Sequence, residues 1–159
     1  MMKHDSNVGI NIFASLAGNW SLVRDLGEAG QFTGDVTFHA ADPGQPNILR
    51  YREEGFLTRP DGVRFDGYRE YDFVLHKDPA AIELLFRDPI GFGNRYVMLH
   101  FGEDADEGLC ARDIHPCGDD FYHHCMIWLD ANHFETKIKI TGPKKDHLLH
   151  SIYRRKSGT

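Results

Sequence analysis

The stretch from His115 to Trp128 reads His-Pro-Cys-Gly-Asp-Asp-Phe-Tyr-His-His-Cys-Met-Ile-Trp, and it decides how the rest of the chain is interpreted. Gly118-Asp119-Asp120 is a typical turn sequence, and Phe121 to Leu129 follows it as an outgoing strand. Successive side chains of a strand point to opposite faces. Neither face of this strand is cleanly polar, which predicts a strand that is covered on both sides or one that faces an internal cavity.

One face of this strand carries phenol and imidazole groups that suit a ligand-binding cavity. By alternation, Tyr122, His124, Met126 and Trp128 share this face. The opposite face carries Phe121, His123, Cys125, Ile127 and Leu129. The stretch therefore predicts a β-hairpin with a neighbouring pocket, and it indicates no particular reaction.

The chain on both sides of this hairpin shows about ten short segments with a period of two, separated by turn residues. Gln31 to Ala40 and His133 to Thr141 alternate most clearly, as half-exposed strands do. No segment has a helical period long enough to cross over a parallel sheet. The other predicted strands are Trp20 to Leu26, Ile48 to Thr58, Val63 to His76, Ala81 to Arg87, Arg95 to Phe101, Gly108 to His115, Phe121 to Leu129 and Asp146 to Lys156.

The connections between these strands are short, which predicts up-and-down connectivity. Gly34, Gly55 and Gly67 lie inside strands and mark places where the sheet can bend. A sheet of this many strands without a covering helix is best closed, because closure removes its edges. We therefore expect an all-β fold, a single closed up-and-down antiparallel β-barrel of about ten strands. Residues 1–159 would form this one domain, with residues 1–15 as an N-terminal extension.

Two segments outside the strands carry separate expectations. Asn7 to Leu16 contains an apolar group that suits a turn of helix or a plug. Glu103 to Glu107 reads as an acidic loop.

Length and cysteine content indicate an intracellular globular domain. A chain of 159 residues can bury roughly 70% of the surface of its unfolded state, so it needs no disulfide bonds or structural metal for stability. Three cysteines without a CxxC pair favour a reducing compartment over a disulfide framework. No run approaches the roughly 18 apolar residues of a membrane span, and Met1 to Asn11 lacks the apolar stretch of a signal peptide. These features predict a cytoplasmic protein with no membrane partner.

The charge distribution argues against nucleic acid as a partner and for a small anion. The formal net charge is −6, which is the wrong sign for a general nucleic-acid binder. Residues 137–159 contain seven Lys and Arg against one Asp, a local net charge of +6. This polarity would steer an anionic molecule toward one end of the fold, although a solvated strand face also explains such a cluster. The oligomeric state stays open, and a homodimer is one of the options.

A resemblance to a known superfamily follows from both ends of the chain. Gly18-Asn19-Trp20, together with Arg154 or Arg155 on the last strand, resembles the Gly-x-Trp plus arginine closure of lipocalins and fatty-acid-binding proteins, the calycins. The chain differs from many lipocalins in lacking a secretory signal. It differs from fatty-acid-binding proteins in lacking a helix-turn-helix lid between the first two strands.

A more specific resemblance extends over nearly the whole chain, to a bacterial lipocalin-like family whose biochemical role is not established. It implies a barrel with an interior cavity and supplies no catalytic residues. The segments that carry it are Leu16 to Trp20, Tyr51 to Gly55, His115 to Tyr122, Gly142 to Asp146 and Tyr153 to Arg155.

A pocket for a small molecule needs mostly apolar walls and a few convergent polar groups. An enclosed Glu53 paired with Arg69 would orient a polar ligand group, satisfy itself, or serve in proton transfer. The candidate ligand-binding residues are Tyr51, Glu53, Arg69, Tyr71, His100, His115, Tyr122, His124, Trp128 and His150.

The histidines and cysteines do not predict a metal or haem site. Structural zinc usually takes ligands at CxxC-like spacing, which the hairpin lacks. No motif singles out His100, His124 or His150 as a haem ligand. Catalytic residues also stay unknown, because Cys117 beside His115 has no third residue to orient the pair. We therefore expect no metal and no cofactor. The side chains of metal-ligand type that cluster in the sequence are His115, Cys117, His123, His124 and Cys125.

The sequence thus predicts a small-molecule binding protein that holds a partly apolar, anionic ligand inside the barrel. The alternative is a barrel enzyme of hydrolase or isomerase type that acts on such a molecule with a His/Tyr/Glu/Arg pocket. A third option is an interaction module whose barrel is filled by its own side chains.

Overall fold

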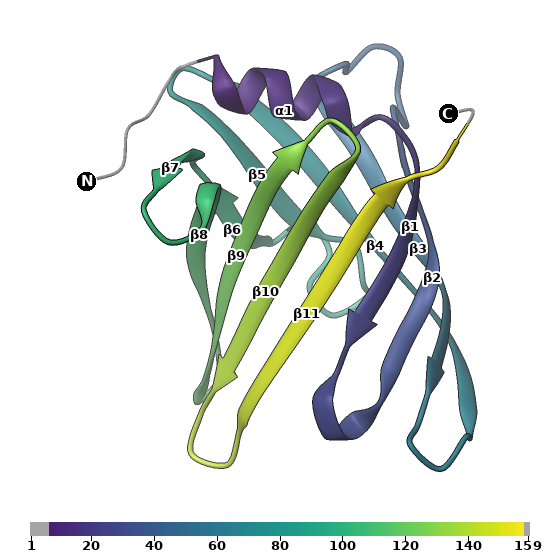
Figure 1. Ribbon diagram of the computed structural model, residues 1–159. Helices are drawn as coiled ribbons and strands as arrows, with labels where there is room; N and C mark the ends of the chain where they lie inside the picture. Colours follow the sequence, from purple (N-terminus) through teal and green to yellow (C-terminus); the bar gives the residue numbers. More distant parts are fainter. Residues whose placement is uncertain (1–6, 158–159) are drawn as a thin grey trace.

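The computed structural model describes residues 7–157 as one helix and a single antiparallel sheet of eleven strands that curls around a core (Figure 1). Two meanders, β1 to β6 and β7 to β11, are joined by the pairing of β1 with β11. A short 3-10 helix, η1 (Gly27–Ala29), connects β1 to β2. The strands are β1 (Gly18–Asp25), β2 (Gln31–His39), β3 (Ile48–Thr58), β4 (Arg64–Lys77), β5 (Ala80–Phe86), β6 (Arg95–Leu99), β7 (Gly102–Asp104), β8 (Gly108–Cys117), β9 (Asp120–Asp130), β10 (His133–Thr141) and β11 (Asp146–Arg155).

The all-β class and the ten predicted strands are confirmed, most of them within one or two residues. One further strand, β7, was not predicted; it overlaps the start of the predicted acidic loop, Glu103 to Glu107. Its three residues are too few to show an alternating pattern, yet Gly102 and Asp104 pair with Cys110 and Gly108 of β8. The Asp104 carboxylate also accepts a hydrogen bond from the backbone N–H of Asp106 (2.8 Å), which fixes the turn that follows.

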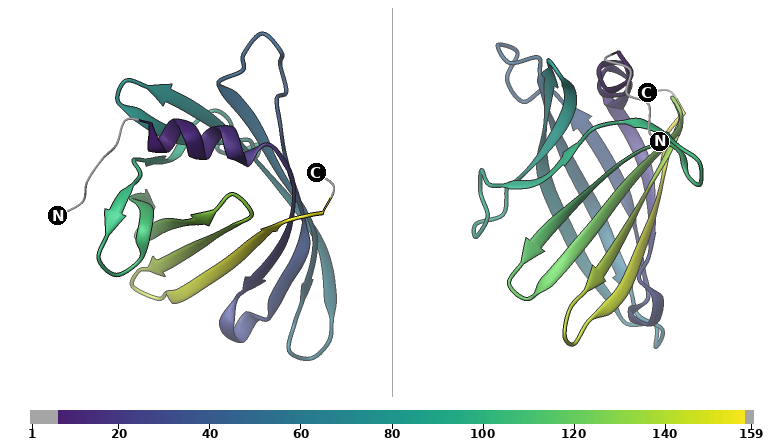
Figure 2. Two further views of the ribbon diagram at one scale, coloured as in Figure 1. Left: turned by 45° about the horizontal axis from the view of Figure 1, so that its top comes forward. Right: turned by 90° about the vertical axis from the view of Figure 1, so that its left-hand side faces the viewer.

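The prediction of a closed barrel is wrong, because the sheet is a strongly curled half-barrel that stays open between β6 and β7 (Figure 2). The strands on one side of the opening become progressively shorter. β4 has 14 residues, whereas β5 has seven and β6 has five. β5 pairs only with the second half of β4, from Tyr71 to Lys77. The remaining part of β4, residues 64–70, pairs with β3 alone in the described structure.

The helix α1 (Val8–Leu16) lies across one end of the curled sheet and covers it (Figures 1 and 2). The predicted turn of helix or plug is thus a nine-residue helix that packs on β4 and β5. Its buried residues, Gly9, Ile12, Phe13 and Leu16, recur at the spacing of one helical face. The helix therefore closes this end with apolar side chains.

Trp20 and Arg155 join the helix, the first strand and the last strand. The Trp20 indole N–H donates to the Leu16 carbonyl at 2.9 Å, and the Arg155 guanidinium lies 4.3 Å from the indole ring centre. Arg155 also donates to the carbonyls of Ala17 (3.0 Å) and Ala131 (2.9 Å). The expected contact between the tryptophan and an arginine is present, and Arg155 makes it, whereas Arg154 points to solvent.

A glycine pair permits the tight curl between β2 and β3. Gly34 and Gly55 are paired across these strands. A Cβ at Gly55 would lie 2.1 Å from the Thr33 carbonyl oxygen, and one at Gly34 would lie 2.3 Å from that of Glu54. Only residues without a side chain allow the two backbones to approach this closely. Gly67 is different, since a Cβ there would meet the Phe32 ring at an ordinary 3.7 Å.

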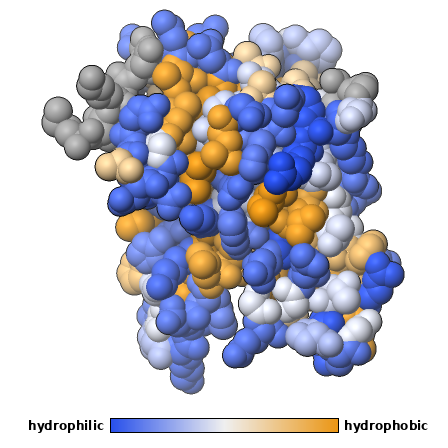
Figure 3. Space-filling model, viewed as in Figure 1, coloured by the Kyte–Doolittle hydropathy of each residue, from blue (hydrophilic) through white to orange (hydrophobic). Residues whose placement is uncertain are grey.

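The alternation of the strands places the aromatic core inside and charged groups outside. Figure 3 shows hydrophilic side chains over most of one outer face, with smaller hydrophobic patches between them. Inside, aromatic rings contact one another from strand to strand. Phe134, for example, stacks on Tyr153 at 4.3 Å between ring centres and meets Trp20 edge-on at 4.9 Å. Trp20, Phe134 and Tyr153 therefore form one packed group of rings inside the sheet.

Candidate functional site

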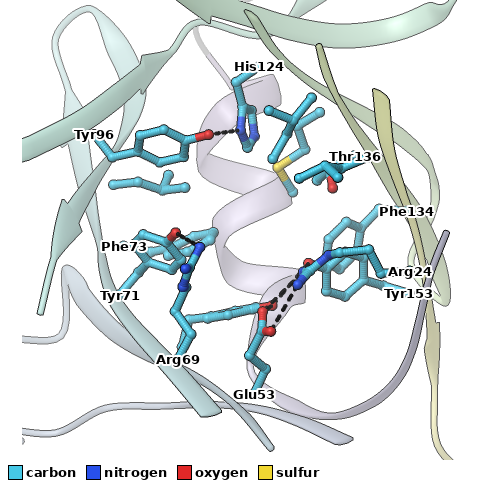
Figure 4. A pocket seen from close by; sticks show the side chains of 15 residues that line it. Arg24, Glu53, Arg69, Tyr71, Phe73, Tyr96, His124, Phe134, Thr136 and Tyr153 are labelled. Carbon is cyan, nitrogen blue, oxygen red and sulfur yellow. Dashed lines mark hydrogen bonds and ion pairs between the residues drawn. The ribbon is translucent and has the colours of Figure 1, made fainter. Parts of the chain in front are cut away.

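A cavity of about 70 Å³ lies inside the curl (Figure 4). Its walls are mainly aromatic and aliphatic, with a few charged and polar side chains among them. The lining residues are Arg24, Tyr51, Glu53, Arg69, Tyr71, Phe73, Leu84, Tyr96, His124, Met126, Phe134, Thr136, Ile138, Leu149 and Tyr153.

An ion pair between Arg24 and Glu53 forms one side of the cavity. Arg24 Nη1 and Nη2 each donate to one Glu53 carboxylate oxygen at 3.0 Å, the two-pronged geometry that suits a guanidinium and a carboxylate. The Tyr51 hydroxyl donates to Glu53 Oε1 at 2.6 Å. Burial raises the pKa of Tyr51 well above its usual value, so this hydroxyl keeps its proton. Glu53 is thus a satisfied, buried carboxylate.

Arg24 has four of its five N–H donors in use. Its Nε donates to Ser151 Oγ at 2.7 Å and its Nη2 to the Tyr153 hydroxyl at 3.3 Å. These contacts tie β1 to β11 across the interior. They leave Arg24 little capacity to bind anything else.

Arg69 does not pair with Glu53, so the predicted ion pair is wrong. The two residues are direct neighbours across β3 and β4, but the Glu53 carboxylate turns toward Arg24. Arg69 Nη1 donates instead to the Tyr71 hydroxyl at 3.2 Å. Within residues 7–157 this is the one hydrogen bond of the Arg69 side chain, and no carboxylate there lies within ion-pair distance of it.

His124 points into the cavity from β9 and is almost fully buried (Figure 4). Its Nδ1 lies 3.2 Å from the Tyr96 hydroxyl, while its Nε2 is buried and has no hydrogen-bond partner in the described residues. Burial lowers the pKa of His124 to about 4, and burial raises the pKa of Tyr96. Both rings are therefore neutral at pH 7.

Five of the ten predicted ligand-binding residues line the cavity: Tyr51, Glu53, Arg69, Tyr71 and His124. Three more face the interior beside it and pack against other rings. His115 lies 5.3 Å from Tyr96 and 6.4 Å from Tyr122 between ring centres, and Trp128 stacks on Phe134 at 5.7 Å.

The remaining two predicted residues, His100 and His150, lie away from the cavity. His100 is exposed in the connection between β6 and β7. His150 is on the outer face of β11, where its Nε2 lies 2.6 Å from Glu135 Oε1. Its neighbours Leu149 and Ser151 face inward instead. A shift of one residue along a strand exchanges the faces, and the sequence did not fix this register.

Arg24 and Tyr96 are among the ten cavity residues that the sequence did not predict as ligand-binding. Arg24 shares a face with Trp20 and Leu22, so alternation from the buried tryptophan was a usable signal. Tyr96 had no such signal, because a bulge between β5 and β6 shifts the pairing at Leu84 and Leu85. Tyr96 and Val97 are consequently both buried, against simple alternation.

The described residues contain no group of three or more His, Cys, Asp or Glu side chains arranged to hold a metal. The hairpin explains why its own His and Cys residues do not gather. His115 pairs with Tyr122 on the inner face, whereas His123 is on the outer face and contacts Thr141. Residues 7–157 also include no helix with the length and apolar character needed to span a membrane.

Comparison with solved structures finds proteins of similar fold. An S-type phycobiliprotein lyase from Guillardia theta has 14% sequence identity and a TM-score of 0.60, over 94% of this chain and 93% of the lyase. A redesigned β-barrel, mFAP1 bound to DFHBI, has 12% identity and a TM-score of 0.46, over 91% of this chain and 98% of that one. No curated protein matches the sequence significantly. Residues 16–155 match the model of a family described as "Family of unknown function (DUF6314)".

Proposed function

We propose that this chain, which belongs to the DUF6314 family of unknown function, binds a small, partly apolar, anionic molecule inside the curled sheet. The proposal is based on the chemistry of the interior. The observation that carries the proposal is the cavity itself. It combines apolar walls such as Phe73, Leu84 and Met126 with two polar groups, Arg69 and His124, that still have hydrogen-bonding capacity. A core that served stability alone would have such groups paired or replaced by apolar ones.

The charges around the cavity favour an anion. Arg24 and Glu53 neutralise each other, since both Glu53 oxygens accept from the guanidinium. Arg69 adds a positive charge that no described carboxylate pairs with. An anionic ligand group would gain a charge-assisted hydrogen bond there.

The volume of the cavity favours a small ligand. The 70 Å³ of the cavity is several times the roughly 10–15 Å³ that one water molecule needs. This is well below the roughly 300–1,000 Å³ of pockets for drug-sized molecules. The bound molecule would therefore be short, with one end near Arg69.

The enzyme alternative is less well supported. Glu53 is held by Arg24 and Tyr51, so its carboxylate is not available as a general base.

We also infer from the contact between Arg155 and Trp20 that the chain is a calycin. We propose a location in the cytoplasm of a bacterial cell, because a reducing compartment suits its three free cysteines.

Native mass spectrometry of the purified protein tests the proposal. We expect a small acid that stays bound under native conditions and is released on denaturation. Ile138→Trp would fill the cavity from β10, so this variant should lose the bound molecule. Lys139→Trp changes the adjacent, exposed residue and should retain it.

Thermal unfolding gives a second readout of the same proposal. Addition of the released acid should raise the Tm of the wild type and of Lys139→Trp, and leave that of Ile138→Trp unchanged. Far-UV circular dichroism would show that both variants are folded. If no molecule co-purifies and no small acid raises the Tm of the wild type, the interior is only a core and the proposal is wrong.

A further inference from the structure

His124 Nε2 is a polar atom that the fold buries without a partner. Among the buried side-chain nitrogen and oxygen atoms of residues 7–157, only this atom and Arg87 Nε lack a hydrogen bond. Arg87 is still engaged through its Nη1, which donates to Asp72 at 3.0 Å. His124 Nε2 instead belongs to a ring that points into the cavity (Figure 4). A buried polar atom left unpaired costs free energy, so the site is complete only when something bonds to it.

The contact with Tyr96 indicates which proton His124 carries. A neutral imidazole has one N–H and one acceptor nitrogen. If His124 Nδ1 accepts the Tyr96 O–H, the tyrosine proton is used and Nε2 carries the remaining ring proton. If Nδ1 donates instead, both the Tyr96 proton and Nε2 lack a partner among the described residues. The first arrangement satisfies more groups, so Nε2–H is a donor directed at the cavity.

Arg69 occupies the opposite side of the cavity in Figure 4. Its single hydrogen bond, to the Tyr71 hydroxyl, leaves the other guanidinium N–H groups free for a planar anion. Arg24 is a weaker site for an anion, because Glu53 neutralises its charge and Glu53, Ser151 and Tyr153 use four of its five N–H donors. The cavity therefore has a cationic end and a neutral donor end, separated by hydrocarbon walls.

From these two ends we infer that the ligand is a short monocarboxylate that carries a neutral oxygen acceptor, an oxo or hydroxy group, at its far end. The inference rests on the proposed function and specifies its ligand. The carboxylate binds Arg69, the neutral oxygen accepts from His124 Nε2–H, and the carbon chain between them contacts the apolar walls. A water molecule at His124 would satisfy Nε2 in the empty protein and would leave when the ligand oxygen arrives.

The His124 end favours a neutral oxygen over a second carboxylate. Asp113 on β8 is the direct cross-strand neighbour of His124. A second carboxylate would lose its hydration among apolar walls and would lie close to the Asp113 charge. A ketone or hydroxyl oxygen has neither cost.

The protonation of His124 can be tested without any ligand. Long-range ¹H–¹⁵N correlation spectra distinguish the two neutral tautomers of each histidine ring. We expect His124 at pH 7 to carry its proton on Nε2. A proton on Nδ1 would overturn the inference, because the cavity would then present an acceptor.

The ligand chemistry is tested with three probes of similar length, 4-oxopentanoate, pentanoate and 2-pentanone. We expect calorimetric titration to show that 4-oxopentanoate binds the wild type at least about tenfold more tightly than either probe that lacks one of its two groups. In His124→Phe the preference for 4-oxopentanoate over pentanoate should fall to about one. In Arg69→Gln the preference for 4-oxopentanoate over 2-pentanone should fall in the same way.

Matched controls are His39→Phe and Arg154→Gln, which change exposed residues of β2 and β11 and should leave both preferences unchanged. Equal binding of pentanoate and 4-oxopentanoate, or a preference that persists in His124→Phe, overturns the inference while a bound small acid in native mass spectra still supports the proposed function. No binding of 4-oxopentanoate at about 10 mM also overturns the inference. The absence of any bound molecule and of any stabilising acid instead rejects the proposed function.

Discussion

Asp113 on β8 accepts a hydrogen bond from the backbone N–H of Met98 on β6 at 2.8 Å, across the flank where the curled sheet stays open. A side chain thus takes the place of a ladder of backbone hydrogen bonds. The other Asp113 oxygen accepts from the backbone N–H of Ile114 at 2.8 Å, which holds the carboxylate in position. Because Asp113 is also the cross-strand neighbour of His124, this contact lies next to the proposed ligand site.

Loss of the Asp113 carboxylate should loosen this flank. Asp113→Ala removes the acceptor for Met98 N–H, and we expect the free energy of unfolding to fall by about 1 kcal/mol, since the side chain is half-buried. Hydrogen exchange of the Met98 amide should become faster. Asp113→Asn keeps an acceptor oxygen and should retain most of the protection. Unchanged exchange in Asp113→Ala would show that the contact does not hold the two flanks together.

Removal of the Glu53 charge should lower the free energy of unfolding far more than removal of the Glu54 charge. Glu53→Gln leaves the Arg24 guanidinium without its counter-ion inside the sheet, and we expect a loss of about 3 kcal/mol in urea unfolding. Glu54→Gln breaks an exposed pair with Arg52 and should cost less than about 1 kcal/mol. Equal losses in the two variants would contradict the assignment of Arg24 and Glu53 as the buried pair.

Stability should fall in mild acid because of His124. Burial lowers its pKa to about 4, so between about pH 6.5 and pH 4 the unfolded state binds more protons than the folded state. The free energy of unfolding therefore decreases as the pH falls through this window, by about 3 kcal/mol in all from this group. Urea unfolding of His124→Gln from pH 7 to pH 4 should show a weaker decrease than the wild type or His39→Gln. The same decrease in all three proteins would refute the assignment.

The close approach of β2 and β3 should make Gly55 intolerant of a side chain. Gly55→Ala places a Cβ 2.1 Å from the Thr33 carbonyl oxygen, so the strands must separate, and we expect a loss of more than about 2 kcal/mol. Gly67→Ala adds a methyl group in ordinary contact with Phe32 and should change the stability by less than about 1 kcal/mol. Thermal unfolding of both variants measures the difference. A tolerated Gly55→Ala would mean that the curl does not depend on this pair.

The strands could be predicted because each alternates over seven or more residues or is bounded by clear turn residues. Ile48 to Thr58 and His133 to Thr141 were predicted with the bounds that the structure has. β7 was not predicted, because three residues are too few to show a period of two. The open flank was not predicted for a different reason. The sequence does not tell whether the two edge strands of the sheet meet so that their backbone groups can hydrogen-bond.

The cavity was half predictable. Tyr51, Glu53, Arg69, Tyr71 and His124 were selected by alternation on strands whose inner face is marked by aromatic neighbours. His150 was selected in error because Asp146 to Lys156 has apolar residues on both faces, so its register could not be read. The predicted partner of Glu53 was also wrong. Arg69 is its direct neighbour on β4, but Arg24, two strands away on β1, binds the carboxylate instead.

The sequence by itself determined the class of fold, the turns and most strand faces, because these follow from local periodicity and turn chemistry. Tertiary structure alone decided that the sheet stays open, that Glu53 pairs with Arg24, and that His124 keeps one nitrogen without a partner. These outcomes depend on which side chains from distant strands meet when the sheet curls. That geometry is set by the curvature of the whole sheet and is not written in any single segment.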